Sequence, residues 1–215
     1  QSDKNGIHFK DVTKTALPGG ANLGMVTTAN WVNMDGDKYP ELVVAGEWMP
    51  CKFFNNKNGV LKEDTRISGF KDHVGMYQDI YPADYNGDGK MDFIVGNAGT
   101  NTQFKASIKK PMKIFDIKDS LNPALRGFLF SYYFKEVEAF ASARGEMLQQ
   151  FVQFRKYFPD FVSYADVDVK GFFKKVEMPE PNPVYECNNL LSGVFMNKGN
   201  GKYEFVSFPE IMQIS

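Results

Sequence analysis

The sequence predicts an all-β fold, and three observations carry this prediction. The first is an acidic loop that occurs twice, in residues 33–42 (NMDGDKYPEL) and residues 84–93 (DYNGDGKMDF), at an offset of 51 residues (84 − 33). The second is the short apolar run with a glycine that follows each loop, VVAG at residues 43–46 and IVG at residues 94–96. The third is the Asn-Gly pair at residues 58–59, which is a strong hairpin signal between two strand-like runs.

A unit of about fifty residues therefore repeats along the chain, and each unit is predicted to consist of short strands. The same offset relates LGM at residues 23–25 to VGM at residues 74–76. In the first unit, the branched residues 26–31 lead into the acidic loop, residues 42–45 leave it, and residues 52–61 form strand, turn and strand. Several short strands per unit are typical of a β-propeller blade. Because one blade cannot bury both of its faces, blades must stack around an axis.

These repeats predict a partial propeller of about three blades. The third repeat is degenerate and is expected to hold a helical insertion at about residues 134–166, because apolar residues recur at helical spacing there. Gly145 is expected to divide this insertion into two helices. The predicted segments are the closing strands of a preceding blade at residues 1–13, the first full repeat at 14–70, the second repeat at 71–112 and the third repeat at 113–215.

Composition excludes some classes of function. Lysine and arginine number 25 and aspartate and glutamate 26, so the formal charge is −1 and no basic surplus points to nucleic acid. No run of about 18 apolar residues exists, so no membrane span is expected. The two cysteines, Cys51 and Cys187, are far apart in the sequence, and either a disulfide or two buried thiols would fit.

The second acidic loop has the residue types and the spacing of a calcium site. Side-chain oxygens fall at its positions 1, 3, 5 and 9, which are Asp84, Asn86, Asp88 and Asp92, and the carbonyl of Lys90 stands at position 7. Calcium prefers six to eight oxygen ligands from carboxylates, amides, carbonyls and water. Two glycines within the loop allow the backbone to curl so that alternate side chains point inward. We therefore predict Ca²⁺ as the cofactor.

The first acidic loop has the same spacing of oxygen ligands, but its residues are less suited to binding calcium. Asn33, Asp35, Asp37 and Glu41 stand at the ligand positions, and Tyr39 supplies the carbonyl. A lysine replaces the second glycine, and glutamate replaces aspartate at position 9. We expect this loop to bind calcium less tightly than the second loop.

The residue types of the acidic loops also fit two other interpretations. Asp, Asn and Gly also favour plain Asx turns without metal, but recurrence at a fixed offset argues against that interpretation. An EF-hand needs a glutamate at position 12 and flanking helices, whereas Val95 occupies that position and the flanks are strand-like. The EF-hand is therefore excluded.

The acidic loops and several other segments of the chain resemble a known family. The two acidic loops resemble FG-GAP/VCBS repeats, and the chain is more closely similar to the cartilage-acidic-protein-like (UnbV/ASPIC-associated) repeat proteins of Bacteroidetes. The closer resemblance rests on residues 9–13 (FKDVT), 46–50 (GEWMP), 96–101 (GNAGTN), 104–107 (FKAS), 164–165 (YA) and 197–201 (NKGNG). It implies a seven-bladed propeller in a secreted or cell-surface protein, with calcium in the blade loops. Two or three blades cannot close such a ring, so the chain is expected to be a segment of a larger propeller.

A third loop of the family pattern would fall at residues 114–119, where the chain departs from that pattern. Ile114 and Lys118 occupy two ligand positions, so no metal is expected there, although Asp116 and Asn122 remain. The neighbouring residues 119–121 (DSL) fit a weak O-glycosylation signal.

The function expected from these patterns is a non-catalytic binding or assembly module at the cell surface or outer membrane, associated with lipoproteins. The histidines, His8 and His73, form no catalytic set, and Trp31 and Trp48 are expected in the blade core. Expected partners are other blades or a protein of a cell-surface complex, with glycan or peptide as further ligands. The alternatives are a propeller-type enzyme processing glycans or peptides at the axis, or a structural scaffold within a longer protein.

Overall fold

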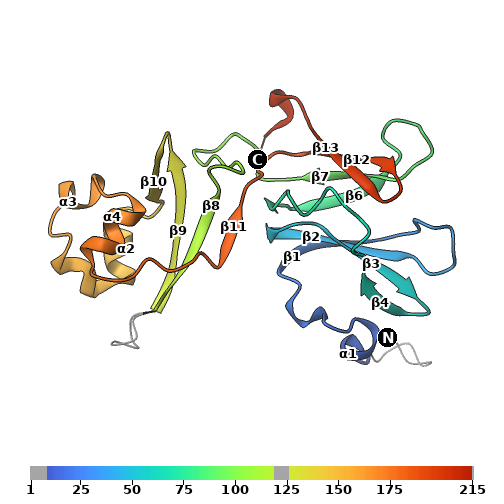
Figure 1. Ribbon diagram of the computed structural model, residues 1–215, viewed down its shortest axis with the longest axis horizontal. Coiled ribbons are helices and arrows are strands. Elements are labelled where there is room, and N and C mark those ends of the chain that lie inside the picture. Colours follow the sequence, from blue (N-terminus) through green and yellow to red (C-terminus); the bar gives the residue numbers. More distant parts are fainter. Residues whose placement is uncertain (1–8, 119–125, 215) are drawn as a thin grey trace. The chain divides into compact units, whose positions relative to one another are not determined.

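The structure is a computed structural model that describes residues 9–118 and 126–214. The chain divides into two compact units, which we call the two-sheet unit (residues 1–101 and 191–215) and the inserted unit (residues 102–190). Both are built mainly on antiparallel β-sheets with a few short helices (Figure 1), in agreement with the predicted all-β class.

The first sheet of the two-sheet unit is formed by residues of the first predicted repeat. Its strand order is β1-β2-β3-β4, and the short strand β5 pairs with β2. Asn58 and Gly59 form the turn between β3 and β4 with φ of 55° and 85°, as the Asn-Gly signal predicts. The strands are β1 (Met25–Val32), β2 (Glu41–Met49), β3 (Lys52–Lys57), β4 (Val60–Glu63) and β5 (Gly75–Met76).

The second sheet combines two strands that precede the inserted unit in the sequence with two strands that follow it. Its order is β6-β7-β12-β13, with all neighbours antiparallel. The predicted boundaries between a second and a third repeat therefore differ from the structure, because the last two strands of this sheet follow the insertion in the chain. The strands are β6 (Asp79–Ala83), β7 (Asp92–Gly96), β12 (Gly193–Gly199) and β13 (Lys202–Ser207), and the short helix η3 (Glu210–Met212) follows them.

One hydrogen bond recurs in both sheets and shows that their hairpins are equivalent. Asn56 at the end of β3 donates from Nδ2 to the carbonyl of Pro40 at 2.9 Å. Asn197 in β12 donates in the same way to the carbonyl of Met91 at 3.1 Å. Pro40 and Met91 are related by the 51-residue offset (91 − 40), so β12 and β13 occupy the places in the second sheet that β3 and β4 occupy in the first.

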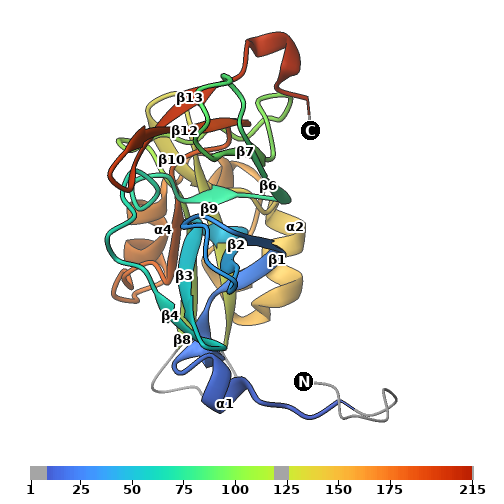
Figure 2. The ribbon, with the colours of Figure 1, turned by 90° about the vertical axis from the view of Figure 1, so that its right-hand side faces the viewer.

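The two sheets are neighbouring layers (Figures 1 and 2) joined by an aromatic core. Phe53 of the first sheet lies 4.9 Å from Phe93 of the second, measured between ring centroids. Phe70 inserts beside them and lies 4.1 Å from Phe195. Each ring is at most 4% exposed, so this burial is a main source of the stability of the unit.

The opposite face of the first sheet is covered by the N-terminal segment. Leu17 and Leu23 pack against its buried residues Val44 and Phe54. This segment holds the short helices α1 (Thr13–Ala16) and η1 (Gly20–Asn22). Of the predicted closing strands at residues 1–13, positions 1–8 lie outside the described residues, Phe9 takes part in a single β-bridge, and α1 begins at Thr13.

The tryptophan prediction was wrong for one residue. Trp31 in β1 is 58% exposed, whereas Trp48 is partly buried with φ of 58°. Trp31 lies near the end of β1, the edge strand of the first sheet, where few neighbours can cover a large side chain.

The inserted unit is one antiparallel sheet with short helices packed on one face. Its strand order is β10-β9-β8-β11. The strands are β8 (Met112–Lys118), β9 (Arg126–Phe134), β10 (Val137–Phe140) and β11 (Tyr185–Cys187). The helices are α2 (Arg144–Gln150), η2 (Val152–Lys156), α3 (Val162–Ala165) and α4 (Val169–Lys175).

The predicted helical insertion therefore needs correction in its place and its extent. It interrupts the second sheet instead of a third repeat, it contains four strands, and its helices begin at Arg144 and end at Lys175. The apolar residues from Phe134 to Phe140 belong to two strands. Gly145 lies inside α2, and the break between helices falls at Phe151, whose φ of −125° is not helical.

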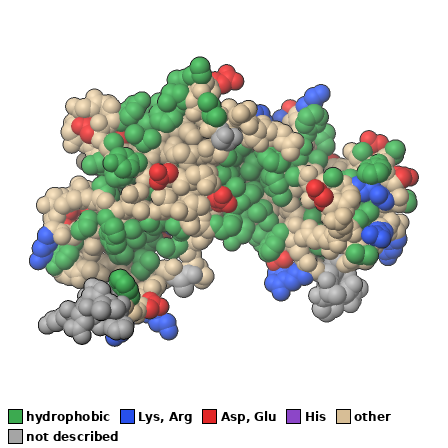
Figure 3. Space-filling model, turned by 180° about the vertical axis from the view of Figure 1, so that it is seen from behind, with side chains coloured by type: hydrophobic (Ala, Val, Ile, Leu, Met, Phe, Trp, Pro, Cys, Tyr) green, Lys and Arg blue, Asp and Glu red, His purple; other side chains and the backbone are tan. Residues whose placement is uncertain are grey.

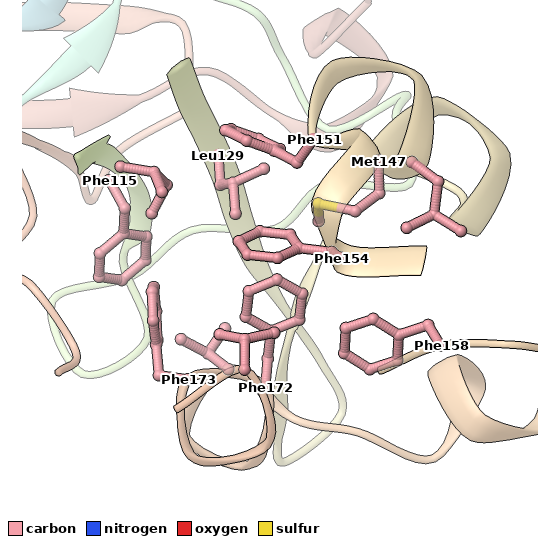
Figure 4. Close-up of a cluster of buried hydrophobic side chains, with 12 residues drawn as sticks. Phe115, Leu129, Met147, Phe151, Phe154, Phe158, Phe172 and Phe173 are labelled. Carbon is pink, nitrogen blue, oxygen red and sulfur yellow. The ribbon is translucent and has the colours of Figure 1, made fainter. Parts of the chain in front are cut away.

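The phenylalanine stripe of the helices packs on the sheet of its own unit. Figure 4 shows Phe151, Phe154 and Phe172 gathered against Leu129 of β9, and Phe173 facing Phe115 of β8. The inserted sheet thus supplies the apolar partner of these helices. The other face of this sheet carries aromatic residues such as Phe128, which is 58% exposed, and Figure 3 shows hydrophobic side chains gathered over β8 and β9.

Both cysteines are free and buried, one in each unit. Burial raises the pKa of the Cys51 thiol well above its usual range and raises the pKa of Cys187 to about 11. Because the thiolate is the reactive form, we expect neither thiol to react with Ellman's reagent at pH 8 while the protein is folded. Both should react after unfolding in guanidinium chloride. Rapid reaction of either thiol in the native protein would contradict the described burial.

Candidate metal-binding loops

The second loop joins β6 to β7 and gathers side-chain oxygens on its own backbone. Asp84 Oδ1 and Asn86 Oδ1 accept hydrogen bonds from the same amide, Asp88 N, at 3.0 and 2.9 Å. Asp84 Oδ2 accepts from the amide of Gly89 at 2.9 Å. Gly87 and Gly89 have φ of 73° and 80°, the left-handed conformation that lets the loop close on itself. The structure thus brings the first three predicted ligands together.

Asp88 is the third of these ligands and is held in its ionised form. Its Oδ1 accepts from the amide of Lys90 at 2.9 Å, and this backbone hydrogen bond is the main cause that lowers the pKa of Asp88. The ammonium of Lys90 lies 3.1 Å from Oδ2 of the same carboxylate. Lys90 was predicted to contribute only a carbonyl, so its ammonium is an unforeseen competitor for a cation. Both side chains are at least one-third exposed, and the pair is weak enough to open.

Asp92 has a different role from the other predicted ligands. Its side chain is fully buried, and its two oxygens accept backbone hydrogen bonds from Tyr85 at 3.1 Å and from Asn197 at 2.7 Å. The first bond holds the loop, and the second holds β12, which is more than 100 residues away in the sequence. Asp92 therefore links the loop to the returning strand.

The first loop repeats this plan at the edge of the first sheet. Asn33 Oδ1 accepts from the amide of Gly36 at 2.6 Å, and the side chain of Asn33 donates to the carbonyl of Asp37. Asp35 Oδ1 accepts from the amide of Asp37 at 3.1 Å, and Asp37 Oδ1 accepts from the amide of Tyr39 at 2.6 Å. As in the second loop, alternate side chains turn inward onto backbone amides.

Glu41 is the position-9 residue of the first loop and behaves only partly like Asp92. Its Oε2 accepts from the amide of Met34 at 2.9 Å, which matches the bond between Asp92 and Tyr85. Its Oε1 is buried and has no hydrogen-bond partner. The longer glutamate side chain therefore leaves one carboxylate oxygen without a donor.

The donor chemistry of both loops fits calcium. Every predicted side-chain donor is a carboxylate or amide oxygen, which is what this ion prefers. Across residues 9–118 and 126–214, however, no three His, Cys, Asp or Glu side chains are arranged to hold a metal ion. A bound ion would have to take the oxygens from the backbone amides that they now accept from.

The stretch proposed as a third loop is a strand in the structure. Asp116 lies within β8, where its Oδ2 pairs with Lys118 and its Oδ1 is buried without a partner. Asn122 and the DSL segment at 119–121 lie outside the described residues. The expectation of no metal there stays a prediction.

Glu47 of β2, Asp79 of β6 and the nearby His73 are engaged in structural contacts. Glu47 accepts from the side chain of Gln78 at 2.9 Å. Asp79 Oδ1 accepts from Thr28 Oγ1 at 3.0 Å and also from a backbone amide. His73 packs 4.8 Å from the ring of Phe205, and burial lowers its pKa against the opposing effect of Asp72.

Asn197 and its counterpart Asn56 hold the strands beside the loops in place, and the sequence analysis did not identify them. Each anchors the third strand of its sheet to the carbonyl just before the position-9 carboxylate. A signal for them exists in the sequence, since NNKNG at residues 55–59 and NKGNG at residues 197–201 both place an asparagine before a lysine and a glycine turn.

Comparison with known protein families supports the repeat that the two acidic loops indicate. Residues 33–95 match the model of the FG-GAP-like repeat, a segment that contains both loops and the strands between them. This match supports the resemblance to FG-GAP/VCBS repeats for that segment. No curated protein and no solved structure matches the chain. Among the described residues, no helix is long and apolar enough to cross a membrane.

Proposed function

We propose that this chain is a non-catalytic, calcium-stabilised segment of a β-propeller that serves binding or assembly at the cell surface. The observation that carries the proposal is the recurrence of one loop plan at the edge of both sheets, inside the segment that matches the FG-GAP-like repeat. In each loop, carboxylate and amide oxygens face inward, and the position-9 carboxylate holds the amide of position 2.

The relation between the two sheets supports the propeller. Thr28 of β1 donates to Asp79 of β6 at 3.0 Å, and these residues are 51 positions apart (79 − 28). Equivalent positions of the two innermost strands are thus neighbours, as in blades arranged around an axis. A blade needs sheets on both faces, which makes other blades the first class of partner.

The outer face of the second sheet supports a further blade as that partner. By the offsets above, its Ile94 and Val194 correspond to Val43 and Phe53, which lie in the core between the two sheets. Within this row Val194 is only 2% exposed, and the exposed apolar surface lies at the two ends, where Tyr81 and Val206 are 62% and 49% exposed. Such an apolar row on a sheet face is suited to packing against another sheet.

Calcium would act by linkage in this proposal. Ionised carboxylates crowd each loop and repel one another, and an ion bound only in the folded state shifts the equilibrium toward folding. Calcium sites in exposed loops suit the millimolar calcium of the extracellular space, where modules bind with Kd of about 10⁻⁴–10⁻³ M. This is the physical support for a secreted or cell-surface setting, in which a partner protein, a glycan or a peptide would be bound.

Thermal unfolding with calcium and with EDTA tests the proposal. We expect calcium at one hundred times its Kd to stabilise the two-sheet unit by about 2.7 kcal/mol and to raise its Tm. The double substitution Asp84→Asn and Asp88→Asn should abolish most of the shift, because it removes two charges from the second loop. Asp72→Asn, which changes an exposed aspartate outside the loops, is the matched control. A Tm indifferent to chelator in the unsubstituted protein would refute structural calcium.

A further inference from the structure

A groove with a volume of about 350 Å³ lies beside the β3–β4 hairpin of the two-sheet unit. Its wall is formed by residues of β3, by residues of β4 and by the segment 64–66 that follows β4. This volume suits a small organic ligand, since ligand sites in proteins usually measure about 300–1,000 Å³. The wall contains no residue of either acidic loop, so the calcium proposal does not use this groove.

The strand register places two lysines on the face of the hairpin that lines the groove. Lys57 pairs with Val60 and Asn55 pairs with Lys62, so these four side chains share one face. Lys57 and Lys62 are therefore diagonal neighbours, a relation in which the two residues lie about 7–8 Å apart. An anionic group with two oxygens can accept a hydrogen bond from each ammonium group across this separation.

The charges around the groove favour an anion. Within the described part of the chain, neither Lys57 nor Lys62 forms an ion pair. Asp64 is neutralised by Arg66, whose Nε and Nη2 lie 2.9 and 2.6 Å from its two oxygens. Glu63 follows Lys62 directly in β4, so its side chain belongs to the opposite face of the hairpin. The two lysines thus leave positive charge in the groove that no carboxylate compensates.

The neutral groups of the groove select among anions. The amide of Asn55 and the hydroxyl of Thr65 can each donate and accept hydrogen bonds. Among the described residues that line the groove, Val60 is the only large apolar side chain, and it is 45% exposed. An apolar anion would therefore bury little of its surface here, whereas hydroxyl groups would find partners. A sugar acid combines a carboxylate with several hydroxyl groups.

We propose that this groove binds a carboxylate-bearing sugar unit of an acidic glycan, with Lys57 and Lys62 as the donors to the carboxylate. Asn55 and Thr65 would contact the sugar hydroxyl groups. The proposal names a ligand for the binding role proposed above, but it uses no metal and no residue of the acidic loops. Failure of the groove to bind would therefore leave the calcium proposal standing, and the reverse is also true.

An NMR titration with small sugars tests this proposal. The probes are glucuronate and, as the neutral comparison, glucose, both at saturating calcium and low ionic strength. We expect glucuronate to bind and to perturb the signals of the β3–β4 hairpin, and glucose to bind much more weakly. The double substitution Lys57→Gln and Lys62→Gln should weaken glucuronate binding about tenfold, because it removes two charge-assisted hydrogen bonds. Lys71→Gln, at an exposed lysine of the same unit outside the groove, should leave the affinity unchanged.

Thermal unfolding of the same variants shows that a loss of binding is not a loss of folding. Both lysines are exposed, so the double variant should keep the Tm of the unsubstituted protein and its response to calcium. Equal binding of glucose, no binding of glucuronate, or an unchanged affinity in the double variant would each overturn the proposal. Nα-acetyl-glutamate amide is a further probe. If it bound as tightly as glucuronate, the groove would recognise the carboxylate alone, and an acidic peptide would replace the glycan as its ligand.

Discussion

Replacing Asp92 with alanine is expected to lower the free energy of unfolding of the two-sheet unit by at least about 3 kcal/mol. The fully buried carboxylate accepts two backbone hydrogen bonds, from Tyr85 and from Asn197. Hydrogen bonds to a charged group contribute about 1.5–3 kcal/mol each, and the substitution leaves both donors without a partner. The β12–β13 hairpin should therefore lose one of its links to β7, while the strand pairing and the bond from Asn197 Nδ2 to Met91 remain.

Denaturant unfolding in the presence of EDTA is the measurement for this substitution. Asp72→Ala, at an exposed aspartate of the same unit, is the control and should change stability by less than about 0.5 kcal/mol. Without calcium, the measurement reports only the backbone hydrogen bonds of Asp92 and not its predicted role as a calcium ligand. If the loss of stability appeared only with calcium present, Asp92 would be a metal ligand and the two backbone bonds would have little energetic weight.

Replacing Phe172 with alanine is expected to destabilise the inserted unit by about 3–5 kcal/mol. The side chain is 1% exposed, and its ring centroid lies 4.9 Å from that of Phe140, 5.4 Å from Phe154 and 5.2 Å from Phe158. Alanine would leave a cavity at the centre of this aromatic cluster (Figure 4), on which the short helices of the unit pack.

The two buried thiols report which unit is affected. Cys187 lies in the inserted unit and Cys51 in the two-sheet unit, so mass spectrometry after thiol labelling measures the opening of each. In the Phe172→Ala variant, Cys187 should be labelled much faster while Cys51 stays protected. Phe161→Ala, at a residue that is 72% exposed, should change neither rate. Equal acceleration at both thiols would mean that the two units unfold as one.

The strands of the repeat were predictable because their signals are local. Branched residues before the first loop, the apolar run after it and the Asn-Gly turn each act over a few residues, and the structure contains β1, β2 and the β3–β4 hairpin at those places. The helices were placed less well. Strand residues at 134–140 happen to continue the apolar spacing of the helices that follow, and spacing alone cannot separate short strands from short helices.

The sequence was enough to predict which residues supply the oxygen atoms of the candidate site, but not which groups those oxygens contact. The spacing of Asp84, Asn86 and Asp88 was enough to predict that their oxygens would lie close together. In the structure, Asp84 and Asn86 both accept from the backbone amide of Asp88. The buried state of Asp92 and the unpartnered oxygen of Glu41 depend on neighbours from other strands. No pattern within the loops encodes those neighbours.

The sequence by itself determined the acidic loops, the tight turns and the 51-residue repeat, because each depends on backbone preferences and oxygen chemistry within a short segment. Only the tertiary structure decided that β7 pairs with β12 across an insertion of 89 residues (102–190), which makes one sheet from two distant segments. Strand pairing is a hydrogen-bonded contact between backbones, which are chemically alike in every strand. The partner is therefore selected by packing, here by Phe93 and Phe195 meeting Phe53 and Phe70 in a shared core.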